Sequence, residues 1–198
     1  MELIKWVLLS SLTLGCVSSV KFHDKVIERN KEHQPPWVEL SVNSFHSMDG
    51  KMAFVGFKDN IVDLPHGIKQ AQVLTLEYSY MALHKKIINQ ILELASEDGF
   101  EVKVTKQMNE LVARAAKSRH KQIKVVDIYY EKYIRSGMNS SVENVASSVY
   151  VLAYFPSKLF DQVLDSSAAS FSQTKSNQLK RLARLIQAHK KVAEENLE

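Results

Sequence analysis

The pattern of apolar and polar positions predicts both strands and helices along this chain. Over residues 37–43 aliphatic and other residues alternate, which predicts a strand with one face in the core. The aliphatic positions are Val38, Leu40 and Val42. Asp49-Gly50 favours a tight hairpin turn. Residues 52–57 (MAFVGF) are therefore predicted to form a second strand, antiparallel to the first.

Two helices are predicted next. Over residues 64–95 large apolar residues recur every three or four positions, which is typical of a helix with one buried face. The set expected to face the core is Val73, Leu76, Tyr80, Leu83, Ile87, Ile91 and Leu94. Pro65 suits the first helical turn and Gly99 suits a helix stop. Residues 103–119 show a similar period and predict a second helix.

The second half of the chain repeats the change from strand to helix. Residues 122–134 and 148–155 are rich in β-branched and aromatic side chains, which favours two strands joined by a turn at 135–139. A short helix is predicted over 157–164 and an amphipathic helix over 171–197. The order strand-strand-helix-helix-strand-strand-helix predicts an α+β fold, a small antiparallel sheet packed against two helices, with an extra C-terminal helix.

The N-terminus has the pattern of a secretion signal. Residues 6–14 (WVLLSSLTL) are uncharged and mostly apolar, and they are too short to span a hydrocarbon core of about 30 Å. Leu12-Thr13-Leu14-Gly15-Cys16 resembles a bacterial lipobox, which implies acylation of the Cys16 thiol and cleavage before it. Several acyl chains would give a stable anchor. Val17 instead of Asp after the cysteine implies sorting to the outer membrane.

These signals divide the chain into four parts. Residues 1–15 are the predicted lipoprotein signal peptide, and residues 16–34 are expected to form a charged, solvated tether that ends at Pro35-Pro36. Residues 35–166 are the predicted α+β domain, and residues 167–198 the amphipathic C-terminal helix. A single cysteine excludes a disulfide framework within the chain, and a net charge of +4 is too small to indicate a nucleic-acid-binding protein.

The order of signals from Pro35 to Leu164 resembles the LPP-twenty family of small bacterial outer-membrane lipoproteins. The carrying segments are Pro36-Trp37-Val38, Ala53–Phe57, the helix from Ile68, Lys124–Tyr129 and Val149–Tyr154. The family includes the flagellar lipoprotein FlgP, and its fold recurs in the N-terminal domain of FlgT. The resemblance implies a structural envelope lipoprotein without catalytic activity, and some members build rings around the flagellar motor.

Candidate chemical groups are scattered. No two of the seven histidines are four residues apart, so no helical metal clamp is predicted, and His84 beside an apolar face is expected to be structural. An acidic group at a helix end is expected to be solvated; it comprises Glu93, Glu97, Asp98 and Glu101. Asp127 either has a raised pKa through burial, or faces solvent or pairs with a lysine. We expect no catalytic residues, metal or cofactor.

Tyrosines and cations on the two later strands allow two interpretations, a nucleic-acid platform or cross-strand packing. The residues are Tyr129, Tyr130, Tyr133, Tyr150 and Tyr154 with Lys124, Lys132 and Arg135. The predicted secretion signal favours packing, or a protein interface, over nucleic acid. The C-terminal helix has three open alternatives: it caps its own domain, packs against another subunit, or lies on an anionic membrane.

The sequence therefore predicts a non-enzymatic outer-membrane lipoprotein, acylated at Cys16, with its body in the periplasm. Its expected role is structural, as a homo-oligomeric ring subunit associated with the flagellar motor and needed for motility. The alternative is a subunit of another envelope assembly, such as a secretion or conjugation apparatus. A ligand-binding or hydrolytic envelope protein is a third class, and the chain shows no nucleophile-elbow or phosphate-loop motif for it.

Overall fold

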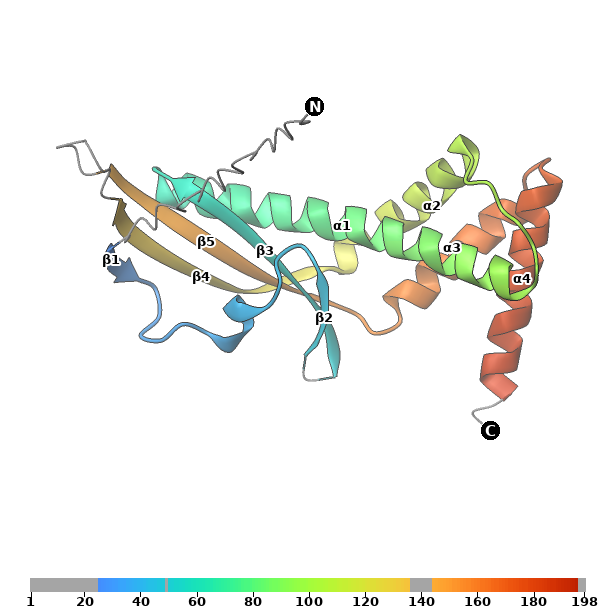
Figure 1. Cartoon of the computed structure of the whole chain (residues 1–198), viewed down its shortest axis with the longest axis horizontal. Coiled ribbons are helices and arrows are strands. Elements are labelled where there is room, and N and C mark those ends of the chain that lie inside the picture. The colour runs from blue at the N-terminus through green and yellow to red at the C-terminus, as the bar shows by residue number, and fades with distance from the viewer. Residues whose placement is uncertain (1–24, 49, 136–143, 196–198) are drawn as a thin grey trace, which may run out of the picture.

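The fold is built around one antiparallel sheet, with helices packed against it and beyond one end of it. In the computed structural model, which describes residues 25–48, 50–135 and 144–195, five strands form one antiparallel sheet in the order β1-β4-β5-β3-β2 (Figure 1). The strands are β1 (Lys25–Arg29), β2 (Phe45–Met48), β3 (Lys51–Ile61), β4 (Lys124–Arg135) and β5 (Asn144–Phe155). The helices are α1 (Leu64–Glu97), α2 (Lys106–Arg119), α3 (Leu159–Ser172) and α4 (Asn177–Glu195). The predicted α+β class is confirmed.

The predicted hairpin around Gly50 is confirmed. Met48 pairs with Lys51 across a two-residue connection, and Gly50 has a φ of +70°, a conformation that glycine adopts without a steric penalty. Strands β4 and β5 pair along their whole length, from Lys124 beside Tyr154 to Arg135 beside Asn144. The predicted turn at 135–139 lies outside the described residues apart from Arg135.

The predicted strand over residues 37–43 is wrong. Pro36–Glu39 forms a short 3₁₀ helix, in which the neighbours Trp37 and Val38 are both buried. Proline pre-sets the backbone angle of a first helical turn, and consecutive buried side chains fit a turn better than a strand. Val42, expected in the core, is exposed. The strand that precedes the hairpin is β2, which begins only at Phe45.

Helix α1 packs on the sheet with its first half and extends past the sheet with its second half (Figure 1). The residues facing inward recur every four positions, and in the first half they are small. The set is Gly67, Ala71, Thr75, Ser79, Leu83, Ile87, Ile91 and Ala95. At Gly56 of β3 a Cβ would lie 1.9 Å from Thr75 Oγ1, so a glycine is needed for this close approach. Val73, predicted to face the core, is 63% exposed.

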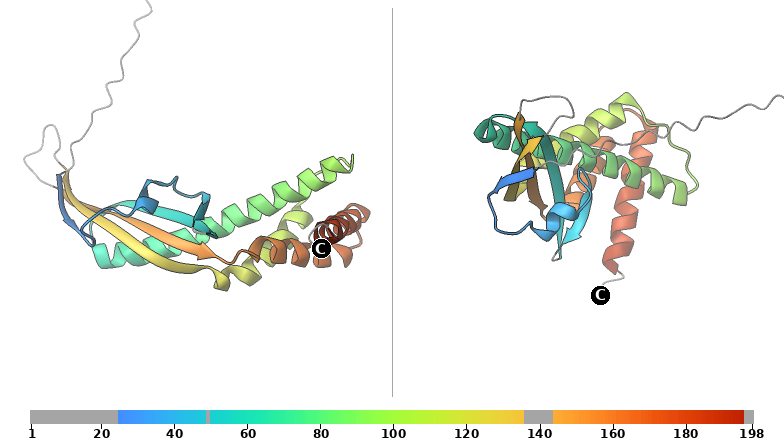
Figure 2. Two further views of the ribbon diagram at one scale, coloured as in Figure 1. Left: turned by 90° about the horizontal axis from the view of Figure 1, so that it is seen from below. Right: turned by 60° about the vertical axis from the view of Figure 1, so that its left-hand side comes forward.

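The second half of α1 forms a helical core with α2, α3 and α4 at the end of the molecule away from β1 (Figure 2). Helix α3 continues to Ser172, so it takes up Phe171, which was predicted to begin the last helix. Helix α4 begins only at Asn177. No helix of the described chain is both long and apolar enough to cross a membrane.

Helix α4 is packed against its own chain. Leu179, Leu182 and Ile186 are almost fully buried and belong to the same core cluster as α1, α2 and α3. Three alternatives were open for the C-terminal helix, and its apolar side follows the first of them: it caps its own domain. That side is already covered within the chain, so it is not the surface that would lie on a membrane or against another subunit.

Candidate functional site

The predicted acylation site, Cys16, lies outside the described residues. The structure describes the chain from Lys25 onward, and that part of the predicted tether is not free. Strand β1 pairs with the outer edge of β4, with Lys25 beside Ile134 and Arg29 beside Glu131. All five residues of β1 are exposed on the surface, yet their backbone is held in the sheet. The prediction of a solvated tether through residue 34 is therefore wrong for this strand.

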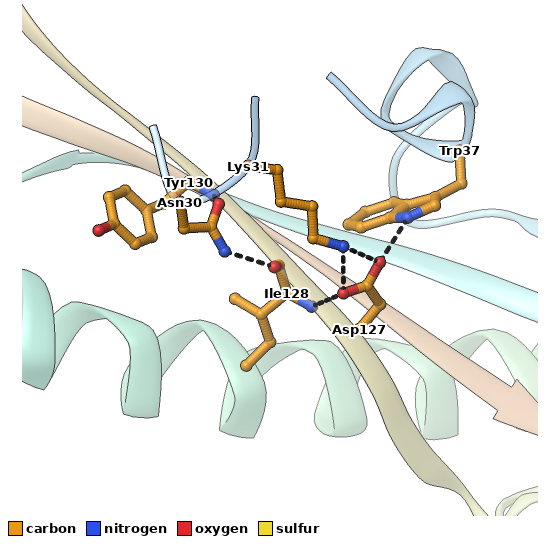
Figure 3. Close-up of polar contacts among 6 residues, drawn as sticks. All are labelled: Asn30, Lys31, Trp37, Asp127, Ile128 and Tyr130. Atoms are coloured by element: carbon orange, nitrogen blue, oxygen red, sulfur yellow. Dashed lines mark hydrogen bonds and ion pairs between the residues drawn. The ribbon is translucent and has the colours of Figure 1, made fainter. Parts of the chain in front are cut away.

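Asn30 extends the pairing past the end of β1 (Figure 3). Its side-chain amide donates to the carbonyl of Ile128 at 2.9 Å, and its Oδ1 accepts from the backbone N–H of Tyr130 at 2.9 Å. The amide group thus satisfies one donor and one acceptor on the β4 edge, as the backbone of a neighbouring strand residue would. The chain is consequently held to β4 along residues 25–30.

Asp127 of β4 is the centre of a second attachment (Figure 3). Lys31 Nζ lies 2.6 Å from Asp127 Oδ1 and also contacts Oδ2, while Trp37 Nε1 donates to Oδ2 at 3.0 Å. The backbone N–H of Ile128 donates to Oδ1 at 2.9 Å. A bulge in β4 between Val125 and Asp127 accompanies this placement. One carboxylate therefore ties two points of the N-terminal segment to the sheet.

The donors around Asp127 determine its charge state. Partial burial alone would raise the pKa of this carboxyl group, but the hydrogen bonds from Lys31, Trp37 and Ile128 N, with the charge of Lys31, outweigh it and lower the pKa. Of the alternatives drawn from sequence, pairing with a lysine is confirmed and a raised pKa is wrong. The group is ionised at neutral pH and both of its oxygens accept hydrogen bonds, so it holds the N-terminal segment to the sheet.

A third contact between the N-terminal segment and β4 is centred on Glu131, which pairs with Arg29 of β1. Arg29 Nε is 2.9 Å from Glu131 Oε1, and the Tyr129 hydroxyl donates to the same oxygen at 2.6 Å. Burial is the larger cause and the hydrogen bond to Glu131 the second; together they raise the pKa of Tyr129 to about 12. Because Tyr129 is fully buried, Glu131 joins the exposed β1 strand to a side chain in the core of the sheet.

The tyrosines of the sheet are packing residues. Tyr129 and Tyr133 are buried, and their hydroxyl groups donate to Glu131 and Asp59, so neither ring is available to stack on a base. The rings of Tyr129 and Tyr150 lie 6.2 Å apart on neighbouring strands. This arrangement supports the cross-strand interpretation of the tyrosine-rich strands.

The other candidate groups are dispersed over the surface. His84 Nε2 lies 3.3 Å from the carbonyl of Asn109 on α2, which fits the expected structural role. In the acidic group at the end of α1, Asp98 Oδ2 accepts from Arg181 of α4 at 3.1 Å. Among the residues that the structure describes, no three or more His, Cys, Asp or Glu side chains gather where they could hold a metal ion.

Comparison of the chain with protein-family models, with curated proteins and with solved structures finds no match in any of the three. The resemblance to the LPP-twenty family therefore stays a prediction.

Sequence reasoning missed the attachment because its partners are far apart. Lys31 and Asp127 are separated by 96 residues, and no local pattern joins them. Two local signals were present in the sequence. Val26-Ile27 is an aliphatic, β-branched pair inside an otherwise charged segment, and Asp127 is an acid placed directly between the aliphatic residues Val126 and Ile128.

Proposed function

We propose that this protein is a non-enzymatic outer-membrane lipoprotein with a scaffolding role in the cell envelope. The observation that carries the proposal is Gly15-Cys16 directly after a short apolar segment, the pattern of an acylated and cleaved signal. Acylation at Cys16 would join the chain to the membrane, and the attachment centred on Asp127 would join the chain to the folded body.

Chain length supports this division of roles. Eight residues, 17–24, separate Cys16 from β1. However they are arranged, they can span at most about 30 Å, since an extended chain rises about 3.3–3.6 Å per residue. The body of an anchored molecule would therefore stay close to the membrane, with β1 at the near end. Helix α4 lies at the opposite end of the molecule (Figure 1).

Metabolic labelling tests the anchor. Cells expressing the protein are grown with an alkyne analogue of palmitate, and membranes are separated on a density gradient. We expect label on the wild type in the outer-membrane fraction, and neither label nor outer-membrane retention for Cys16→Ala. Cys16→Ser is the conservative control, because it keeps the size of the side chain and lacks the thiol. An unlabelled wild type would overturn the lipoprotein proposal.

The proposed assembly is a ring associated with the flagellar motor, as the LPP-twenty resemblance implies; the alternative is another envelope apparatus. The test is the swimming of a deletion strain complemented with the wild type or with Cys16→Ala. Loss of swimming that only the acylatable form restores would support the flagellar role. Normal swimming of the deletion strain would overturn it and favour another envelope assembly.

A further inference from the structure

One stretch of the sheet edge has no neighbouring strand in the part of the chain that the structure describes. Strand β2 pairs only with Lys51–Phe54, and the backbone N–H of Asn43 bonds to the Val55 carbonyl at 2.7 Å. From Phe57 to Ile61 no strand of the described chain lies on this side of β3. The pairing of β3 with β5 shifts register between Lys58 and Ile61, so the regular part of this free edge is at Phe57 and Lys58. Because the outward-facing backbone groups alternate along a strand, Phe57 presents its N–H and C=O on the same side as Val55.

A groove beside this free edge suits an acidic strand. It has a volume of about 430 Å³ and is lined by Lys58, Lys69, Gln70, Val73 and Leu74, between β3 and the flank of α1. Neither Lys58 nor Lys69 forms an ion pair with any residue that the structure describes. A strand added to β3 would direct alternate side chains into this groove, where an aliphatic stem and a carboxylate would both find partners.

The opposite edge of the sheet carries such a strand. Among the described residues, strand β1 is bonded on one side only. Glu28 lies on the face of the sheet that α1 covers, since it accepts a hydrogen bond from Tyr130, which packs against the α1 cluster. Its second oxygen lies 3.5 Å from Lys132 of its own chain, an exposed ion pair that Lys58 of another copy would join. Lys58 lies on the same face of β3, because it lines the groove with α1. Cross-strand neighbours share a face of a sheet, so Glu28 of one copy can lie opposite Lys58 of another.

The directions of the strands agree. Each neighbouring pair in the order β1-β4-β5-β3 is antiparallel, so β1 and β3 run in opposite directions. A second copy placed beside β3 in the same orientation therefore brings its β1 alongside in the antiparallel sense. Every copy then keeps Lys25 at the same end, as a common membrane requires. Pairing of two β1 strands about a two-fold axis would point the bodies in opposite directions.

We propose that copies of this protein associate head to tail, with β1 of one copy added to the free edge of β3 in the next. The inference rests on the proposed scaffold role and names the interface through which the subunits would assemble. Such a contact uses two different surfaces, so it continues from copy to copy and produces a ring or a filament. Anchoring in one membrane raises the effective concentration of the subunits.

A disulfide test follows from the pairing of Glu28 with Lys58. In the acylated protein Cys16 is blocked, so introduced cysteines would be the only thiols. Membranes carrying Glu28→Cys/Lys58→Cys are oxidised, and the products are separated without reductant. We expect a ladder of dimers, trimers and larger species, because opposed strand residues are close enough for a disulfide. Glu28→Cys/Glu93→Cys, with the second thiol on the exposed side of α1, is the control and should give no ladder.

A charge exchange gives an independent measurement. Light scattering of the acylated protein in mild detergent should show that Lys58→Glu raises the concentration needed for association by about fivefold, the size expected for an exposed ion pair. Glu28→Lys/Lys132→Glu/Lys58→Glu should restore it, because the exchange at Lys132 keeps the ion pair between β1 and β4 within each copy. A monomer at all concentrations, dimers from Glu28→Cys alone, or equal ladders from the control pair would each overturn the proposal. Palmitate labelling is unaffected by these results, so a failed interface and a failed anchor are distinguishable.

Discussion

Asp127→Asn should loosen the N-terminal segment while the rest of the fold stays intact. Asparagine keeps the shape of aspartate but has no charge, and its amide nitrogen replaces one of the two acceptor oxygens. At Asp127 the two oxygens together accept from Lys31, Trp37 and the backbone of Ile128. The variant therefore loses the ion pair and leaves at least one donor without its acceptor.

The magnitude follows from these contacts. A hydrogen bond to a charged group contributes about 1.5–3 kcal/mol, and the partial exposure of Lys31 and Asp127 favours the lower half of that range. A loss of about 2 kcal/mol raises the population with an open N-terminal segment by about 30-fold, since 1.4 kcal/mol corresponds to a factor of ten. Because β1 is exposed and short, opening of this segment does not require unfolding of the core.

Limited tryptic digestion measures this opening. The readout is the rate of cleavage after Lys31, followed by mass spectrometry of the fragment that begins at Glu32. When opening and closing are fast compared with cleavage, this rate follows the open population, so we expect about 30-fold faster cleavage in Asp127→Asn.

The matched control is Asp98→Asn, which removes a single exposed ion pair with Arg181 at the other end of the molecule. Its expected effect on cleavage at Lys31 is nil. Cleavage of Asp127→Asn within threefold of the wild-type rate would refute the reasoning, as would an equal acceleration in Asp98→Asn.

Three further predictions concern the fold and its pH dependence. Gly56→Ala should reduce the free energy of unfolding in urea by about 3 kcal/mol, because the new Cβ would overlap Thr75. Gly50→Ala meets no neighbouring atom and is strained only by its positive φ, so it should cost less, about 1–2 kcal/mol. The pKa of Asp127 is lowered in the folded protein, so its contribution to stability is complete above the unfolded pKa of about 4. That contribution should disappear as the pH falls through the folded value, and an acid titration of wild type against Asp127→Asn measures it. Leu182→Ala should lower the melting temperature through a loss of about 2–5 kcal/mol, because Leu182 is buried against its own chain; an unchanged melting temperature would contradict the packing of α4 within the chain.

The secondary structure of the central part was predictable from local patterns. The helix over 64–95, the strands that became β3, β4 and β5, and the turn at Gly50 all follow from periodicity and turn chemistry. The prediction failed at Trp37, where an alternating pattern coincides with a 3₁₀ turn after two prolines. It also misplaced the break between the last two helices: helices over 157–164 and 171–197 were predicted, whereas α3 runs to Ser172 and α4 begins at Asn177.

Local pattern determined that α1 is a helix, and only the tertiary structure decided which of its faces is buried. The period of large residues placed Val73 inward, whereas the sheet accepts the small residues Ala71 and Thr75 because β3 approaches closely at Gly56. The candidate site around Asp127 was likewise decided by the tertiary structure. The lipobox-like pattern at Cys16 is a local signal, so its prediction needs the sequence alone. The attachment of Lys31 to Asp127 depends on two strands that meet only when the whole sheet forms, and no short-range property of the chain specifies that meeting.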